Sequence, residues 1–238
     1  MKIITRLCLL SLFPLTLLLG DHLLFTELVL QPSAGEYVKI SNPTSAEIDL
    51  SDYYISDAAD PANGKFYYHL PSGENYWSGS STDFIARFPA GTSLAPGASL
   101  ILGLGRNSDY LAQYGSNPDL ALKDDMLSVS QSVNTLGGSP NAKLDNIAES
   151  LILFYWDGSS ATVKDVDYLI WGNNSYAIDK SGVSGYQNDT PAASQSIMPV
   201  HADGEKLIRS GDEGTEISSG GNGITGHDET SENLAQTW

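Results

Sequence analysis

Residues 23–57 read LLFTELVLQPSAGEYVKISNPTSAEIDLSDYYISD, and their pattern already indicates a class of structure. Short runs rich in leucine, β-branched and aromatic residues predict strands over Leu23–Leu30, Glu36–Ser41 and Ser51–Ser56. The clusters QPSAG and SNPTSAE between these runs contain the Gly, Pro, Asn and Ser residues that are typical of turns. Closely spaced short strands joined by such turns indicate an all-β protein.

The remainder of the chain continues this pattern. Further strands are predicted over Lys65–Leu70, Ser99–Leu104, Ser150–Trp156, Thr162–Trp171, Ser196–Val200 and Lys206–Arg209. Ser99–Leu104 and Ser150–Trp156 are the most apolar, so we expect them to be buried central strands. Only Ser108–Tyr114, followed by Gly115, predicts a helix. This composition of elements predicts a sandwich or a barrel.

Four segments resemble motifs of the lamin tail domain as it occurs in secreted bacterial proteins. They are residues 23–57, FPAGTSLAPGASLILGLG at 88–105, SDYLAQYGSNPDLAL at 108–122, and ESLILFYWDGSSATVKDVDYLIWG at 149–172. The last segment departs from the family pattern at Tyr155-Trp156, where an Asp-x pair is commoner. The resemblance implies an immunoglobulin-like β-sandwich with one short helix and long loop insertions at Ala58–Asp83 and Ile178–Ser196. It implies no catalytic residues, because lamin tail domains are binding and structural modules.

The first twenty residues differ in character from the rest. Lys2 and Arg6 precede an apolar run from Leu7 to Leu19, and the small residue Gly20 follows. This order is typical of a secretory signal peptide, and the run is shorter than the ~20 residues of a membrane span. We therefore expect a leader at 1–20, a single lamin-tail-like domain at 21–238 without a transmembrane span, and a location outside the cell or in the cell envelope. Cys8, the single cysteine, would leave with the leader, which excludes disulfides and thiol chemistry in the mature chain.

The charge of the chain restricts its partners. With 29 Asp and Glu against 12 Lys and Arg, the formal net charge is -17. Nucleic acids and anionic membrane surfaces attract basic patches, so neither is an expected partner. We expect a protein or a glycan at the cell surface instead.

Catalytic motifs are missing from the sequence. It contains no H-E-x-x-H, no G-x-S-x-G and no G-x-x-x-x-G-K-[ST], so we predict a protein that is not an enzyme. One catalytic alternative stays open, a secreted hydrolase with two carboxylates ~5 to 9 Å apart across a cleft. Candidate pairs are Asp124-Asp125, Asp165 with Asp167, Glu213 with Glu216, and Asp228-Glu229. Solvated strand faces explain these acids better than a catalytic pair does.

Calcium is the cofactor that the composition leaves open, in a calcium-stabilised carbohydrate-binding or adhesion domain. Asp57, Asp60 and Asn63 place oxygen donors three residues apart before Gly64. The order of an EF-hand loop is absent, and side chains that cap a turn explain these residues more simply.

Aromatic side chains crowd FYYHLPSGENYW at residues 66–77, and surfaces that bind glycans or peptides are built from such rings. If this segment is a strand, about half of its rings face the core. Tyr76 and Trp77 are the candidate ligand surface, with Trp77 the ring most expected on the exterior.

The last residues, SGGNGITGHDETSENLAQTW at 219–238, offer a weaker metal set in His227, Asp228 and Glu229. Successive side chains of an extended chain point to opposite faces, so three in a row rarely bind one ion. We therefore predict the polar surface of a loop that closes the domain, followed by a strand that ends in a buried Trp238. The family ending, an arginine strand, a polar loop and a tryptophan, fits Arg209 and Trp238.

Overall fold

The computed structural model describes residues 20–57, 59–77, 82–129, 143–211, 213 and 216–238. The expected leader lies outside the described residues, apart from Gly20. Among the helices of the described ranges, none has both the length and the apolar character that crossing a bilayer requires.

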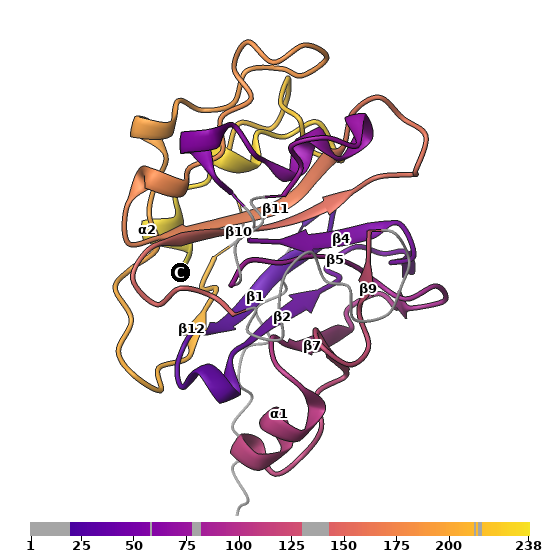
Figure 1. The fold of residues 1–238 in the computed structure, drawn as a ribbon, viewed down its shortest axis with the longest axis vertical. Helices are drawn as coiled ribbons and strands as arrows, with labels where there is room; N and C mark the ends of the chain where they lie inside the picture. The colour runs from indigo at the N-terminus through magenta and orange to yellow at the C-terminus, as the bar shows by residue number, and fades with distance from the viewer. Residues whose placement is uncertain (1–19, 58, 78–81, 130–142, 212, 214–215) are drawn as a thin grey trace, which may run out of the picture.

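Two five-stranded sheets form the body of the molecule (Figure 1). The first has the order β12-β1-β2-β7-β8, with bounds Leu207–Ile208, Leu24–Val29, Tyr37–Ser41, Ser99–Gly103 and Leu120–Ala121. The second has the order β11-β10-β4-β5-β9, with bounds Lys164–Trp171, Glu149–Tyr155, Tyr53–Ser56, Ile85–Arg87 and Leu127–Ser128. A small third sheet pairs β3 (Ile48–Asp49) with β6 (Ser93–Leu94). The predicted immunoglobulin-like all-β sandwich is confirmed.

Most of the strands predicted between residues 23 and 209 are present, and two of them are wrong. Lys65–Leu70 is not a strand, because η3 (Tyr67–Ser72) coils through it as a 3₁₀ helix that contains Pro71. Ser196–Val200 is irregular chain, held to β11 at Met198, whose N–H donates to the Ile170 carbonyl. In both segments tertiary contacts determine the conformation more strongly than the local preference of aromatic and branched residues for strands.

The predicted helix is α1 (Asn107–Tyr114), which ends at the left-handed Gly115. The chain also ends in a helical turn, α2 (Leu234–Thr237), where a strand was predicted. Short 3₁₀ helices occupy η1 (Ser33–Gly35), η2 (Pro61–Asn63), η3, η4 (Asn174–Tyr176), η5 (Ala192–Ser194) and η6 (Glu229–Ser231).

The hydrophobic core lies between the two sheets. Leu28, Val38 and Leu102 of the first sheet belong to the same buried cluster as Ile55 and Leu153 of the second. The two strands predicted to be central do lie inside their sheets, since β7 runs between β2 and β8 and β10 between β11 and β4. All residues of β10 except Tyr155 are buried, which requires cover on both faces of its sheet.

A layer of loops supplies this second cover. We call it the outer layer, and it consists of residues 59–77, 174–196 and 216–232, drawn above β10 and β11 in Figure 1. Tyr67 of η3 packs on Phe154 of β10 with ring centroids 4.9 Å apart. The described parts of both predicted insertions therefore cover the second sheet.

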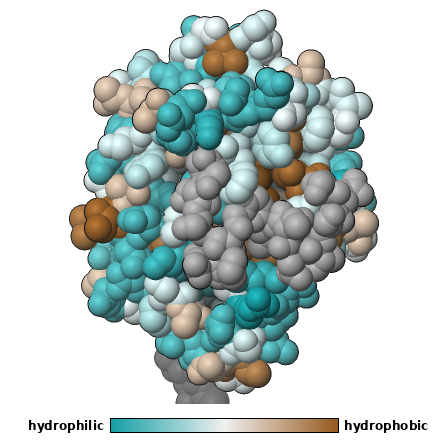
Figure 2. Space-filling view, in the orientation of Figure 1, coloured by the Kyte–Doolittle hydropathy of each residue, from teal (hydrophilic) through white to brown (hydrophobic). Residues whose placement is uncertain are grey.

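The exterior is polar. Hydrophilic residues predominate on the face in Figure 2, where hydrophobic residues form small patches. The most exposed large hydrophobic side chains of the described residues, Val200 and Ile147, lie far apart in the sequence.

Candidate functional site

Asp57, Asp60 and Asn63 do not converge. Asp57 is buried, and its Oδ1 accepts a hydrogen bond from the backbone N–H of Phe84 at 2.6 Å. Asp60 caps η2, accepting from the Asn63 backbone N–H at 3.2 Å and from Asn63 Nδ2 at 2.8 Å. Turn capping therefore accounts for Asp60 and Asn63, and anchoring of the Phe84 backbone accounts for Asp57.

Tyr76 and Trp77 are both half-buried and pack against the core cluster. Trp77, the ring most expected on the exterior, is only partly exposed, because the outer layer folds back onto the second sheet. Phe66 and Tyr68, which precede them, stack with ring centroids 5.0 Å apart.

Asp228 and Glu229 are buried, so the prediction of a polar loop surface is wrong for both. Asp228 holds the turn of η6: its carboxylate accepts from Thr230 Oγ1 at 2.6 Å and from Thr190 Oγ1 at 2.7 Å. His227 and Glu229 instead approach residues from elsewhere in the chain. The backbone turns sharply at this point, so the alternation expected of an extended strand does not apply.

A buried histidine–carboxylate cluster forms where the first strand meets this C-terminal loop. We define it as His22, Asp167, Glu213, Glu216, His227 and Glu229. Donor atoms of His22, Glu213, Glu216 and His227 all lie within 4.8 Å of one another, and so do those of Asp167, Glu213 and Glu229. Glu213 belongs to both groups, so the cluster is continuous.

His22 enters the cluster immediately before β1. Its Nδ1 lies 3.0 Å from the carbonyl oxygen of Leu23, to which it donates when protonated, and this leaves Nε2 facing the carboxylates. Nε2 is 3.2 Å from Glu213 Oε2 and 4.0 Å from Glu229 Oε1. At the other side of the cluster, His227 Nδ1 is 3.2 Å from Glu216 Oε2.

Three buried carboxylate oxygens of the cluster lack a hydrogen-bond partner, namely Glu213 Oε1, Glu216 Oε1 and Glu229 Oε1, and His22 Nε2 has only its ionic contact with Glu213 without hydrogen-bond geometry. Buried polar atoms are nearly always hydrogen-bonded, so a group of four that face one another calls for an explanation.

The pKa values respond to this crowding. Burial and the charge of Glu213 raise the pKa of Glu216 to about 9, and burial and the charge of Glu216 raise that of Glu229 well above its usual range. Burial opposes the imidazolium form of His22, but its contact with Glu213 outweighs burial and raises the pKa to about 9. The cluster therefore holds an excess of negative charge that favours protons or another cation.

Asp165 and Asp167 of β11, expected on a solvated strand face, are both buried. The outer layer covers them and supplies the cation for Asp165: Lys180 Nζ lies 2.7 Å from Asp165 and 2.8 Å from Asp189. Asp167 pairs with Arg209, which follows β12 and also binds Glu232. Each of the two aspartates thus forms a buried ion pair, with Lys180 or with Arg209, so neither is free to act in a catalytic pair.

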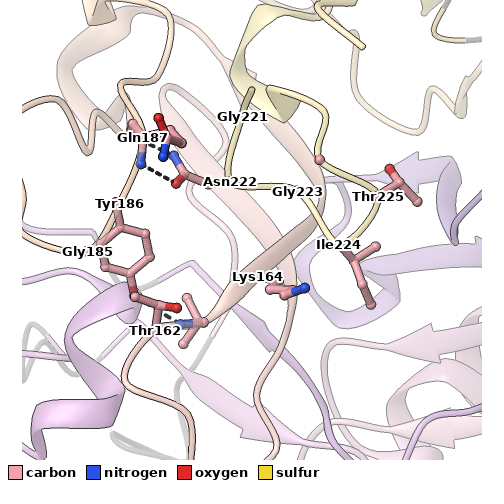
Figure 3. A pocket seen from close by; sticks show the side chains of 12 residues that line it. Thr162, Lys164, Gly185, Tyr186, Gln187, Gly221, Asn222, Gly223, Ile224 and Thr225 are labelled. Atoms are coloured by element: carbon pink, nitrogen blue, oxygen red, sulfur yellow. Dashed lines mark hydrogen bonds between the residues drawn. The ribbon is translucent and has the colours of Figure 1, made fainter. Parts of the chain in front are cut away.

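A groove of about 440 Å³ opens beside the C-terminal loop at residues 221–226 (Figure 3). Its walls are residues 162–164, 185–187 and 221–226. Tyr186 fixes one wall, since its hydroxyl donates to the Tyr68 carbonyl and accepts from the Val163 N–H. Asn222 fixes the other wall by hydrogen bonds to the Gln187 backbone. No carboxylate or imidazole is among the residues that line the groove.

The sequence model of the Lamin Tail Domain matches residues 20–169. The chain belongs to the lamin tail domain family. This family is immunoglobulin-like and generally non-enzymatic. β12 lies beyond the matched residues and still completes the first sheet by pairing Leu207 with Leu28.

Among solved structures, the chain is similar to the crystal structure of a DUF4876 family protein from Bacteroides thetaiotaomicron VPI-5482. The identity is 14%, the TM-score is 0.45, and the similarity covers 87% of this chain and 67% of that chain. No curated protein matches the sequence.

Sequence reasoning did not place His22 in any site, and it treated Glu213 and Glu216 only as a pair of acids. A histidine next to an aspartate at the start of a strand carries no motif. The sequence offered one signal, the spacing of three residues between Glu213 and Glu216. It indicates a metal site only together with the fold, which places His22 beside these two residues and His227.

Proposed function

We propose that this chain is a secreted, non-enzymatic lamin tail module that binds a protein or glycan at the cell surface or in the cell envelope. The observation that carries the proposal is the groove beside residues 221–226, which offers an aromatic ring, amides, hydroxyls, backbone groups and the amine of Lys164 but no carboxylate or imidazole. Sites for polar ligands combine such groups. The leader-like residues 1–20 favour export.

The hydrolase alternative has less support. General acid–base hydrolysis needs two carboxylates that face a substrate-sized cleft. The acidic side chains of the cluster are at most 9% exposed and lie close to one another, while the groove contains no carboxylate.

A groove-blocking variant tests the proposal. Thr225 is exposed on the groove wall, and Thr225→Arg would place a long side chain there. Ser45→Arg adds the same charge at an exposed position of another loop and serves as the matched control. Fluorescently labelled mature protein is added to cells of the producing organism, and surface-bound protein is quantified by flow cytometry.

We expect saturable binding of the wild-type protein that falls at least tenfold in Thr225→Arg and persists in Ser45→Arg. Wild-type protein that does not bind, or equal binding by both variants, would refute the proposal. Release of reducing sugar ends by the purified protein would favour the hydrolase instead.

A further inference from the structure

The histidine–carboxylate cluster has an electrostatic imbalance that its own side chains do not resolve. Asp167, Glu213, Glu216 and Glu229 are gathered around two imidazoles, and Arg209 is committed to Asp167 and Glu232. Burying several like charges without matching cations is strongly unfavourable. These four atoms without hydrogen bonds face an excess of carboxylates, so the arrangement suits a bound cation.

We propose that His22, Glu213, Glu216 and His227 bind one divalent transition-metal ion of the Zn²⁺ type. Two imidazole nitrogens and two carboxylate oxygens form a donor set that suits Zn²⁺, whereas Ca²⁺ and Mg²⁺ prefer oxygen alone. This inference is independent of the partner that the groove binds.

The distances agree with this assignment. Bond lengths of about 2.0–2.1 Å in a tetrahedral Zn²⁺ site place neighbouring donor atoms roughly 3.3 Å apart. The pair His22–Glu213 and the pair His227–Glu216 are each already at 3.2 Å. A modest contraction brings the two pairs together, since all four donors lie within 4.8 Å of one another.

The surroundings of the donors also resemble those of metal ligands. His22 is fixed by the contact of its Nδ1 with the Leu23 carbonyl, which orients Nε2 toward the carboxylates, and an ion that binds Nε2 displaces the proton from it. Glu229 Oε1, 4.0 Å from His22 Nε2, and Asp167 form a second tier of negative charge. Asp21, with 59% of its side chain exposed, lies 3.6 Å from His227 Nε2 and adds a further negative charge at the solvent side of the cluster.

The glycines of the C-terminal loop allow this packing. A Cβ on Gly223 would collide with Glu229 Oε1 and lie 2.8 Å from the His227 carbonyl oxygen, and a Cβ on Gly221 would collide with the His227 backbone. The glycine-rich turn is thus required to place His227 and Glu229 against His22.

Metal-dependent unfolding of the mature protein, stripped with a chelator and dialysed, tests the proposal. We expect Zn²⁺ at one hundred times its Kd to raise Tm by about 5–10 °C. Co²⁺, used as a spectroscopic probe, should give visible d–d absorption in the wild-type protein. His22→Gln and the nearly isosteric Glu216→Gln should weaken Zn²⁺ binding at least about 100-fold, because even lost supporting contacts cost 10–100-fold. The histidine control His201→Gln, outside the cluster, should bind as the wild type does.

A wild-type protein whose Tm does not respond to Zn²⁺ and which shows no Co²⁺ absorption overturns the proposal, and that readout does not depend on whether any variant folds. A response to Ca²⁺ without one to Zn²⁺ overturns the assignment of the imidazole donors. Cooperative unfolding shows that Glu216→Gln is folded. If His201→Gln then loses as much Zn²⁺ affinity as Glu216→Gln does, the placement of the site is overturned.

Discussion

Arg209 Nη2 lies 3.2 Å from Asp167 Oδ2, and this ion pair joins the two sheets of the sandwich at the edge where β12 and β11 approach each other. Asp167 also accepts the backbone N–H of Phe25 in β1, and the Arg209 Nε donates to the Phe25 carbonyl at 2.8 Å. Glu232 completes the arrangement from the C-terminal loop. One buried guanidinium thus links β1, β11 and the end of the chain.

Arg209→Met should lower the free energy of unfolding by about 3–5 kcal/mol, because it leaves Asp167 and Glu232 buried without their cation. Arg106→Met is the matched control: Arg106 pairs with Asp124 at 2.8 Å but has 52% of its side chain exposed, so its loss should cost less than about 1 kcal/mol. Urea denaturation measures both. Equal costs would show that the Arg209 pair contributes no more than a surface pair.

Lys180→Met should destabilise the protein by a similar amount, about 3–5 kcal/mol, since Asp165 and Asp189 lose their shared partner. Hydrogen exchange should quicken in residues 178–189, the part of the outer layer that Lys180 anchors. Lys164→Met, an exposed lysine on the same strand as Asp165, should leave both readings unchanged.

Stability should fall as pH rises from about 4.5 to about 8, in part through Glu36. Burial raises the pKa of Glu36 from 4.5 to about 8, so its neutral form is favoured in the folded protein. Its contribution is complete below pH 4.5 and is lost as pH rises through 8, at up to ~1.4 kcal/mol per pH unit. Glu36→Gln should therefore raise Tm at pH 8 and change it little at pH 4.5. A variant with the same pH dependence as the wild type would contradict this.

Trp238→Ala should cost about 2 kcal/mol. The ring is half-buried, packs against the core and lies 5.3 Å from the Arg209 guanidinium carbon, so burial and a cation–π contact both contribute. Trp238→Phe retains a ring over Arg209 and should recover at least half of the loss in thermal denaturation. The partial exposure makes this cost smaller than the full burial expected from sequence would imply.

Gly223→Ala should destabilise the protein by about 1–3 kcal/mol, because the added methyl group displaces Glu229. Gly211→Ala meets only ordinary contacts at 3.7 Å or more and should be nearly neutral. Calorimetry of the two variants compares them directly, and a neutral Gly223→Ala would mean that the loop can relax away from His227.

The strands were predictable because their cause is local. The apolar runs of β1, β7 and β10 and the turns between them follow from residue order. The outer layer was not predictable in this way, since its contacts are long-range. Tyr67 of η3, for example, donates its hydroxyl hydrogen bond to Asp165, 98 residues away in the sequence. In the sequence, Asp165 and Asp167 have the spacing of residues on a solvated strand face, but in the structure the outer layer covers both. The candidate cluster escaped sequence reasoning for the same reason: His22 meets Glu213 only after the sandwich has formed.

The pairing of β1 with β12 has a consequence for how the chain is made. Synthesis proceeds from the N-terminus, but Leu28 pairs with Leu207, and His22 contacts Glu213 and His227. Such contacts form only after the later residue has been synthesised, and their large sequence separation slows folding. The edge of β1 that pairs with β12 therefore stays open until residues 207–208 have been synthesised, and it can bind a chaperone during that time. Closure of this edge is a late step of folding.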